Sequence, residues 1–423
     1  MKYLVRDAKI FMEQANALAD KGKNEVIYCS QWQTAYPKFE DFAVGLDFEY
    51  LKKKDKHGNP LLFWDYVEWA DCICNFDVHM NDEIAALRRL FPKKSIWGAG
   101  LGEKLEADRI ALKQFLSALG LPMQKWKAVK GVTELENYIK SHPDQYIKLN
   151  IFRGDEGMES FHAKDIDDIQ QKLLKMRLTY GPKAEDMPFV VEETIDTPVE
   201  IGYDGFFNGH NYADKCFLGY EYHKNLYVAK VTDFVDLPDP IYETMDAFAP
   251  VLEKMDFHGG LSTEEKIVSP KEHYFLDICA RLPSPLSALY PVMIKNWPEL
   301  VYKFGKGEDV ALDIDAKYVA AMALEAEGLD HDFMEIKIKP GSRDKVRFQC
   351  ACQDDKKGYW GVRGNKNACI LVAQGNSVDE VLGNLKKNAD LVDVDGIDKD
   401  DLNGIDIVKE IIKKGESCGI KFS

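Results

Sequence analysis

The first hundred residues alternate short apolar runs with amphipathic stretches. The runs NEVIYCS and ADCICNFD are apolar enough for buried strands, whereas FMEQANALADKGK repeats apolar residues at helical spacing. The run KSIWGAG adds a further strand that ends in glycines. This alternation predicts an open, mostly parallel α/β sheet over residues 1–100. No G-x-G-x-x-G string follows the first strand, so the dinucleotide-binding form of such a sheet is not indicated.

The next two hundred residues change in pattern. The amphipathic run LEADRIALKQFLSALG predicts a helix that ends before Pro122. The strand-like runs WKAV and QYIKLN follow, with a second helix between them, and the region from Met187 to Arg281 is rich in strand patterns. We therefore expect a central unit over residues 101–308, with a smaller lobe over about 123–188 and a large antiparallel or mixed sheet.

The tail from residue 309 combines both patterns. AKYVAAMALEAEG and SVDEVLGNLKKNADLV have the spacing of helices, and KVRFQCACQ and NACILVAQG read as strands between them. The tail thus predicts a small α+β domain over residues 309–423. No apolar run reaches the roughly 20 residues of a membrane span, and no secretory leader is recognisable, so we expect a cytoplasmic protein without membrane contact.

The composition limits the classes of ligand that the chain is expected to bind. The 423 residues suit two to four domains. They include 71 acidic and 55 basic side chains, a net charge of −16. A long phosphate backbone would be repelled, which disfavours nucleic acid but leaves a small nucleotide pocket open.

Two carboxylates flank a predicted hairpin in the segment EEKIVSPKEHYFLDICARLPSP. Glu265 and Asp277 stand on the two strands, on either side of a turn at residues 269–272, so we expect them side by side. Oxygen ligands of this kind suit Mg²⁺. Arg281 follows on the same strand face by period-two alternation and would bind a phosphate or a carboxylate. On spacing alone, a solvent-facing ion pair is an equal alternative.

Lys148 ends the apolar run QYIKLN, directly before a loop that contains Gly154 and Gly157. A lysine in that position can reach a phosphate while glycine N–H groups approach the same oxygens. The alternative is a solvated turn, and the G-x-x-x-x-G-K-[ST] string of a Walker loop is absent.

These segments, taken in order, resemble the ATP-grasp superfamily of ligases. The resemblance rests on EADRIALKQFLSALGLP, YIKLN with its loop, VVEETIDTPVEIGYDG and STEEKIVSPKEHYFLDICARLPSP, between Gly98 and Pro285. The tail is similar to that of the phosphoribosylamine–glycine ligase branch. The resemblance implies an N-terminal parallel α/β domain, an ATP-grasp unit of two lobes and a C-terminal α+β domain. It also implies ATP with Mg²⁺, or Mn²⁺ as an alternative.

The resemblance assigns roles residue by residue. The implied nucleotide contacts are Arg109, Lys148, Arg153, Gly154, Glu192, Glu193 and Glu200. The implied metal ligands are Glu265 and Asp277, and the implied catalytic residues are Arg281, Lys148 and Lys224. Glu192 and Glu193 would begin the hinge that holds the adenine, Glu200 would bind the ribose hydroxyls, and the loop from Arg153 to Ser160 would close over the reaction.

The chain also departs from the family at specific positions. Asp277 and Cys279 stand where the family usually has Glu and Asn, and a thiol is a poor ligand for a hard cation. Arg6, Asp7 and Ala8 follow the first strand where the glycine-ligase branch has a glycine-rich segment.

Three functions remain open. The first is a carboxylate–amine ligase that acts through an acyl-phosphate and releases ADP and phosphate. The second is phosphoribosylamine–glycine ligase itself, of purine biosynthesis, and the third is a nucleotide-binding protein without catalysis. The expected partners are small-molecule carboxylates and amines, and the expected state is a monomer or homodimer.

Overall fold

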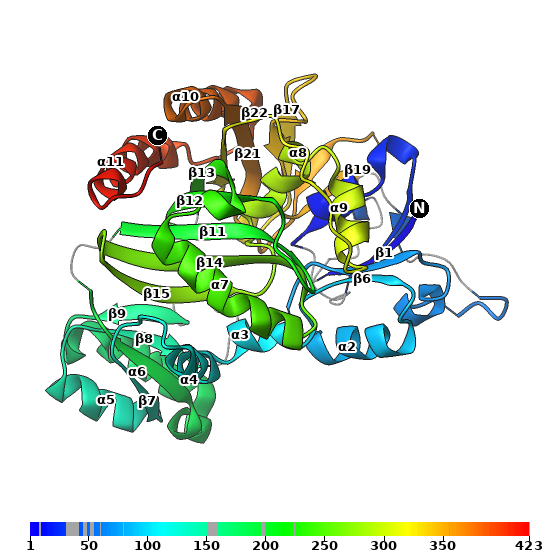
Figure 1. The fold of residues 1–423 in the computed structure, drawn as a ribbon. Helices are drawn as coiled ribbons and strands as arrows, with labels where there is room; N and C mark the ends of the chain where they lie inside the picture. Colours follow the sequence, from blue (N-terminus) through cyan, green and yellow to red (C-terminus); the bar gives the residue numbers. More distant parts are fainter. Residues whose placement is uncertain are drawn as a thin grey trace.

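The architecture comes from a computed structural model. It describes residues 1–7, 10–30, 42–44, 49–50, 55–59, 61–78, 80–150, 159–195, 199–223, 225–354 and 356–422. Figure 1 shows the N-terminal sheet, the small lobe around β7 and β8, and a long central sheet that the C-terminal strand β21 continues, with a further sheet that contains β17, β19 and β22.

The N-terminal sheet is parallel, as the alternating pattern predicts. Its strand order is β4-β2-β1-β5-β6, and neighbouring strands are parallel throughout. The strands are β1 (Lys2–Asp7), β2 (Glu25–Ser30), β4 (Glu49–Tyr50), β5 (Cys72–Asn75) and β6 (Ser95–Trp97). The helices of this region are α1 (Met12–Ala17), shorter than its sequence pattern predicts, and α2 (Asn81–Leu90).

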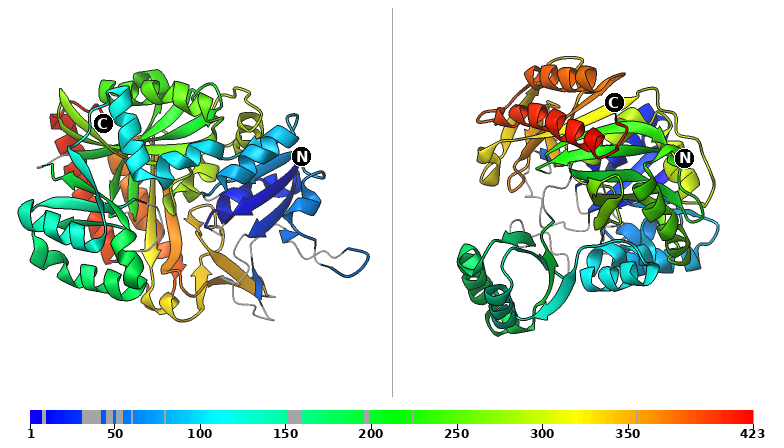
Figure 2. Two further views of the ribbon diagram at one scale, coloured as in Figure 1. Left: turned by 90° about the horizontal axis from the view of Figure 1, so that it is seen from below. Right: turned by 60° about the vertical axis from the view of Figure 1, so that its left-hand side comes forward.

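The small lobe has a separate apolar core. Its sheet, in the order β7-β10-β8-β9, is antiparallel and comprises β7 (Trp126–Lys130), β8 (Gln145–Leu149), β9 (Ser160–Ala163) and β10 (Pro188–Glu193). The helices α5 (Val132–Ser141) and α6 (Ile166–Tyr180) cover one face of it, packing Leu135 and Leu173 against Ile147. Helix α4 (Arg109–Leu119) leads into the lobe. One view in Figure 2 shows the lobe standing off from the rest of the molecule.

The central sheet has eight antiparallel strands in the order β15-β14-β11-β12-β13-β16-β21-β18. Those before residue 309 are β11 (Val199–Asn208), β12 (Lys215–Tyr222), β13 (Leu226–Asp233), β14 (His258–Ser269) and β15 (Glu272–Cys279). Those after it are β16 (Tyr318–Glu325), β18 (Val346–Arg347) and β21 (Asn367–Gly375). The helix α7 (Asp239–Lys254) lies across this sheet (Figure 1). One sheet thus crosses the boundary that the sequence predicts at residue 308.

Strand β16 corrects one sequence prediction, because AKYVAAMALEAEG has helical spacing. In the structure Tyr318–Glu325 pairs with β13 on one side and β21 on the other. Its first seven residues are all buried. A strand buried on both faces reads as a continuous apolar run, which periodicity does not distinguish from a buried helix.

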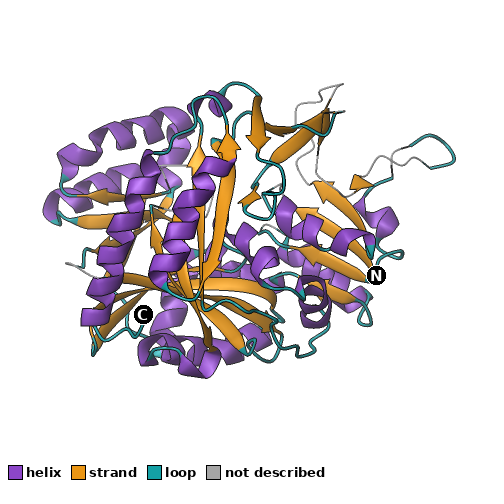
Figure 3. Ribbon diagram, turned by 90° about the horizontal axis from the view of Figure 1, so that it is seen from above, coloured by secondary structure: helices purple, strands orange, loops and turns teal. Residues whose placement is uncertain are grey.

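The remaining elements surround these sheets (Figure 3). A five-stranded sheet contains β3 (Phe42–Val44), β17 (Met334–Ile338), β19 (Ala351–Asp354), β20 (Tyr359–Gly361) and β22 (Val392–Asp393). The other helices are α3 (Lys104–Ala107), α8 (Tyr290–Met293), α9 (Trp297–Phe304), α10 (Val378–Asn388) and α11 (Gly404–Ser417). Among the described helices, none has the length and apolarity that crossing a membrane requires.

Candidate functional site

A buried lysine joins the small lobe to the central sheet. The Nζ atom of Lys148, on β8, lies 3.6 Å from Asp277 on β15 and 3.3 Å from Glu192 on β10. It also donates a hydrogen bond to the carbonyl oxygen of Leu276 at 3.3 Å. Burial alone would lower the pKa of Lys148, but the carboxylates of Asp277 and Glu192 more than offset this, so the pKa is raised and the ammonium stays charged.

Glu192 belongs to the same ion network rather than to an open nucleotide surface. It is fully buried, and its second oxygen lies 2.5 Å from Nζ of Lys113 on α4. Burial would raise the pKa of Glu192, yet the two lysines more than offset that effect and lower it. Glu193, the neighbouring hinge candidate, is exposed and lies 3.4 Å from Lys125.

Arg109 begins α4 and points toward the same cluster. Its guanidinium donates to the carbonyl oxygen of Leu149 at 2.7 Å and pairs with Glu159 at 2.9 Å. Burial would raise the pKa of Asp277, but Lys148 and Arg109 outweigh it, so the pKa is lowered. The structure therefore brings Arg109, Lys148 and Asp277 together.

The carboxylate opposite Asp277 is Glu264, not Glu265. In the β14–β15 ladder Glu264 pairs with Asp277 and Glu265 pairs with Phe275, so Leu276 is an extra residue that forms a bulge. The bulge shifts the phase of β15, and Glu265 shares its face with Phe275, which stacks on Phe248 of α7. The expected pairing of Glu265 with Asp277 is thus corrected, since the side chain of Glu265 is 1% exposed beneath α7.

Further carboxylates surround Glu264. Burial, followed by the charges of Glu221, Asp277 and Glu200, raises the pKa of Glu264 to about 8. Glu200, expected at the ribose, is partly exposed on β11, 3.4 Å from Lys266. Crowded carboxylates of this kind favour a divalent cation. Among the described residues no three such side chains form a complete metal site, so phosphate oxygens and water would have to complete the coordination.

Arg281, just beyond the end of β15, is held by Glu106 of α3. Its Nε donates to Glu106 at 3.0 Å, and Glu106 also accepts a hydrogen bond from the backbone N–H of Ala280 at 2.8 Å. Burial would lower the pKa of Arg281, but Glu106 outweighs it and the pKa is raised. Arg281 lines a crevice shared with Asn75 and Asp77 of the N-terminal unit.

Several site residues escape the sequence interpretation. Glu264 is missed because only the bulge decides which of two adjacent glutamates faces Asp277. Lys113 and Glu106 lie on helices whose patterns give no sign of their partners, which are on β10 and just beyond the end of β15. The predicted residues Arg153, Gly154 and Lys224 lie outside the described residues.

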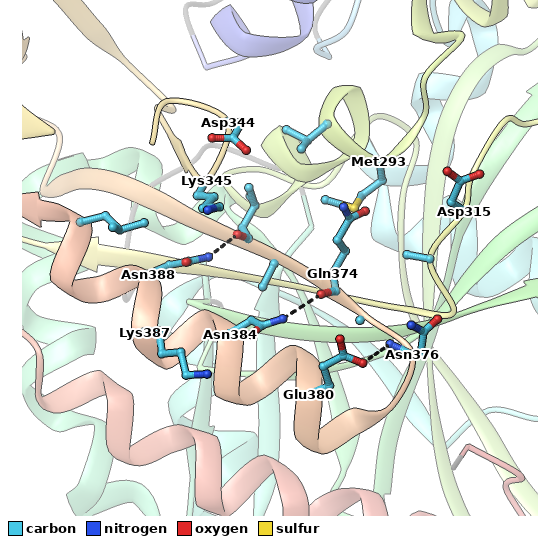
Figure 4. A pocket seen from close by; sticks show the side chains of 16 residues that line it. Met293, Asp315, Asp344, Lys345, Gln374, Asn376, Glu380, Asn384, Lys387 and Asn388 are labelled. Atoms are coloured by element: carbon cyan, nitrogen blue, oxygen red, sulfur yellow. Dashed lines mark hydrogen bonds between the residues drawn. The ribbon is translucent and has the colours of Figure 1, made fainter. Parts of the chain in front are cut away.

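A cavity of about 680 Å³ lies elsewhere, between α10, β21 and residues near Met293 (Figure 4). Two side-chain amides that line the cavity are hydrogen-bonded to the backbone that surrounds it. Asn384 donates to the carbonyl oxygen of Gln374, and Asn388 donates to that of Val372. None of the residues expected at the nucleotide site lines it. The ion cluster at Lys148 is therefore the better candidate site.

A small antiparallel lobe that faces a carboxylate-bearing sheet is the arrangement of the ATP-grasp fold, and comparison with solved structures confirms that this chain has it. Phosphoribosylamine–glycine ligase from Thermotoga maritima is 14% identical, with a TM-score of 0.65 over 94% of this chain and 98% of that one. Biotin carboxylase from Campylobacter jejuni, solved as a complex with β,γ-ATP, is 13% identical, with a TM-score of 0.64 over 95% of each chain.

N5-carboxyaminoimidazole synthetase from Staphylococcus aureus, solved with ADP, is 13% identical, with a TM-score of 0.58 over 92% of this chain and 97% of that one. No family model and no curated protein matches the sequence. The similarity therefore lies in the fold, and the residues must support any statement about chemistry.

Proposed function

We propose that this protein is an ATP-dependent ligase that joins a carboxylate to an amine. The observation that carries the proposal is the inter-lobe cluster, in which Lys148 and Arg109 face Glu264 and Asp277. Phosphoryl transfer depends on positioning and charge neutralisation, and this cluster supplies both kinds of charge in a buried place. Solved neighbours of the same fold hold ADP or an ATP analogue, which supports the same interpretation.

The cluster divides into two roles. Lys148 and Arg109 would bind the nucleotide phosphates, and Glu264 with Asp277 would hold Mg²⁺ or Mn²⁺. When bound, the cation neutralises phosphate charge. The backbone at the end of β10, beside Glu193, would hold the adenine, and Glu200 would accept hydrogen bonds from the ribose.

Arg281 would hold the substrate carboxylate, because Glu106 fixes its guanidinium at the neighbouring end of β15. The carboxylate oxygen bonds to the γ-phosphorus as the bond to ADP breaks, which gives an acyl-phosphate. The amine then forms the C–N bond and phosphate leaves. In balance, RCOO⁻, ATP⁴⁻ and R′NH₃⁺ give the amide, ADP³⁻, HPO₄²⁻ and one H⁺.

Phosphoribosylamine–glycine ligase activity is the second candidate, because the Thermotoga maritima enzyme of that name matches this chain over nearly its whole length. A non-catalytic nucleotide-binding role is the third, since Cys279, the last residue of β15, stands between Asp277 and Arg281 in the sequence. That the protein acts in the cytoplasm, as a monomer or homodimer, on small molecules alone stays a prediction.

The test is ADP release with a panel of carboxylates, Mg-ATP and hydroxylamine, which traps an acyl-phosphate as a hydroxamate. Lys148→Ala and Asp277→Ala should each lower the rate at least a hundredfold. Lys130→Ala, which removes a largely exposed lysine of the same lobe paired with Asp186, is the matched control and should keep the wild-type rate.

Calorimetry of Mg-ADP binding gives a readout apart from turnover. Lys148→Ala should weaken binding about tenfold or more, because the phosphates lose their buried cation. Carboxylate-dependent ADP release that is unchanged in both cluster variants would refute the ligase proposal.

A further inference from the structure

The cavity between α10 and β21 has the size of a ligand site of its own (Figure 4). Its volume of about 680 Å³ falls within the range of small-molecule pockets, roughly 300–1,000 Å³. Apolar side chains from several segments contribute to its lining, among them Val292, Met293, Ala316 and Leu391. The polar groups of the lining therefore decide which ligand it can hold.

The middle of the cavity follows one edge of β21. Strand β18 pairs with β21 only as far as Leu371, so beyond that residue no strand among the described residues covers this edge. Asn388 of α10 donates instead to the carbonyl oxygen of Val372, at 2.9 Å. Asn384 donates to that of Gln374, at 3.2 Å. Uncharged amides thus line the middle of the cavity, and such groups suit hydrogen bonds with peptide groups.

The end of the cavity beside Val372 is basic. The N–H of Val372 donates to the carbonyl oxygen of Lys345 at 3.0 Å, which places Lys345 at this end. Lys387, in the last turn of α10, precedes the asparagine that bonds to Val372. Both lysines are exposed, and neither pairs with a carboxylate of the described residues. The carboxylate of Asp344, which also lines the cavity, interacts with Arg347.

The opposite end of the cavity is acidic. Glu380 lies in the first turn of α10 and accepts a hydrogen bond from the Asn376 N–H at 2.8 Å. Asp315 lies just before β16, which pairs with this end of β21. Asp315 shares Lys295 with Asp313, so one lysine serves two carboxylates. This end therefore keeps a net negative charge.

The separation of charge belongs to the cavity and not to α10 alone. Helices commonly carry acidic side chains in the first turn and basic ones in the last. Here Lys345 and Asp315, from other segments, repeat the polarity of α10, and Figure 4 shows the two lysines on the left and the two carboxylates on the right. Glu380 and Lys387 are seven residues apart. At 1.5 Å per residue this is about 10 Å, the length of three residues of extended peptide.

We infer that this cavity binds a short peptide with free ends, whose carboxylate lies at the Lys345–Lys387 end and whose ammonium lies at the Glu380–Asp315 end. A zwitterion of this length meets opposite charge at both ends, whereas a ligand with one sign of charge meets like charge at one of them. The site is separate from the ligase function proposed above and adds a second class of ligand.

The first test compares trialanine with its N-acetyl and C-terminal amide forms, by calorimetry on the full chain. Each capped form lacks one charge and keeps the peptide groups. We expect wild type to bind trialanine at least tenfold more tightly than either capped form. It should also bind trialanine at least tenfold more tightly than ε-aminocaproate, which has both charges but no peptide group.

Variants assign the two ends. Lys387→Ala should bind trialanine as weakly as wild type binds the C-terminal amide. Glu380→Gln, which keeps an acceptor for the Asn376 N–H, should bind it as weakly as wild type binds the N-acetyl form. Lys386→Ala and Asp379→Asn remove exposed neighbouring charges of α10 that do not line the cavity, and as matched controls they should keep wild-type affinity.

Lys345→Ala repeats the test of the basic end on another segment, should Lys387→Ala lower the urea midpoint. All of these variants should keep wild-type affinity for Mg-ADP, because none of them changes the cluster at Lys148. Loss of trialanine binding in the cavity variants, with the controls unchanged, supports the inference. Equal binding of trialanine and its capped forms or ε-aminocaproate, unchanged binding in the cavity variants, or no binding of trialanine overturns it.

Discussion

Glu264 and Glu265 are neighbours in sequence but lie on opposite faces of β14. The bulge at Leu276 leaves Glu264 opposite Asp277, whereas Glu265 is buried beneath α7. If two carboxylates hold one metal ion, removing either of them lowers the affinity for that ion. We therefore expect Glu264→Gln to raise the Mg²⁺ concentration for half-maximal ADP release at least tenfold, and Glu265→Gln to leave it unchanged.

The same comparison can be made without turnover, by titrating Mn²⁺ into the ADP complex and following the water-proton relaxation rate. Equal Mn²⁺ affinity in both variants, or a loss confined to Glu265→Gln, would contradict the assignment of Glu264.

Glu265 should instead control stability. Burial raises its pKa to about 8, whereas its ordinary value is 4.5. Between these values the folded protein binds the proton and the unfolded chain does not, so stability falls as pH rises and levels off above about 8. Glu265→Gln removes this dependence, which amounts to about 3 kcal/mol between pH 6 and pH 8 because one pKa unit corresponds to about 1.4 kcal/mol. Urea midpoints at pH 6 and pH 9 should converge in the variant relative to wild type; an unchanged difference would contradict the shift.

At the scale of single residues, the sequence identifies the charged side chains of the site better than it identifies their interaction partners. The resemblance assigns Arg109 and Lys148 to the nucleotide and Asp277 to the metal, and in the structure the charges of Lys148 and Arg109 both act on Asp277. The interpretation failed at Glu265, because a single extra residue in a strand reverses the face of every side chain beyond it. The sequence therefore predicts the order of the polar residues, but it does not predict on which face of the strand each of them lies.

At the scale of elements, β16 shows where periodicity fails. Its alanines favour a helix, yet all seven residues from Tyr318 to Leu324 are buried between two neighbouring strands. The long-range pairing outweighs a local preference worth a few tenths of a kcal/mol per residue. The amphipathic helix α10 was predicted correctly, because one face of it meets solvent. The run LEADRIALKQFLSALG was predicted as one helix, but extended backbone at Asp108, whose side chain caps α4, divides it into α3 and α4.

Strand β12 contains a glycine that an aromatic ring covers. A Cβ on Gly219 would lie 2.2 Å from the ring of Tyr227, whose hydroxyl donates to the buried Asp204. Gly219→Ala must displace that ring, so we expect a loss of about 1–3 kcal/mol in the free energy of unfolding. Gly383→Ala is the control, because nothing lies within 4 Å of its added methyl on α10. It should be neutral or stabilising; equal urea midpoints for both variants would contradict this account.

For the whole molecule, one buried glutamate links the N-terminal unit to the segment around β18. Glu13 of α1 is 1% exposed and pairs with Arg343 and, at 3.2 Å, with Arg347. It also accepts a hydrogen bond from the Phe348 N–H at 2.9 Å. Glu13→Ala leaves two arginines without their counter-ion, so we expect a loss of about 3–5 kcal/mol.

The measurement is urea unfolding together with limited proteolysis of the native protein. Proteolysis should begin between the N-terminal unit and the central sheet. Lys23→Ala, which removes an exposed partner of Asp20, is the control and should change neither readout. A wild-type urea midpoint for Glu13→Ala would show that the two segments are held by packing alone.

The sequence predicts the three-part order of the molecule but not how the parts join. Alternating patterns correctly indicate the parallel N-terminal sheet. They contain no information on β16 and β21 continuing the central sheet, because strand partners far apart in sequence leave no local signal. The resemblance of ordered motifs supplied the two-lobed unit that composition and periodicity did not.

The ion pair between Lys148 and Asp277 also affects the affinity for nucleotide. Lys148 already forms an ion pair with Asp277 across the two lobes. A phosphate that binds to Lys148 must therefore replace this ion pair with a new one. The contribution of Lys148 to the free energy of ATP binding is then the difference between the free energies of these two ion pairs. A substitution that weakens the resident pair, such as Asp277→Asn, would tighten metal-free nucleotide while it weakens the metal-bound form.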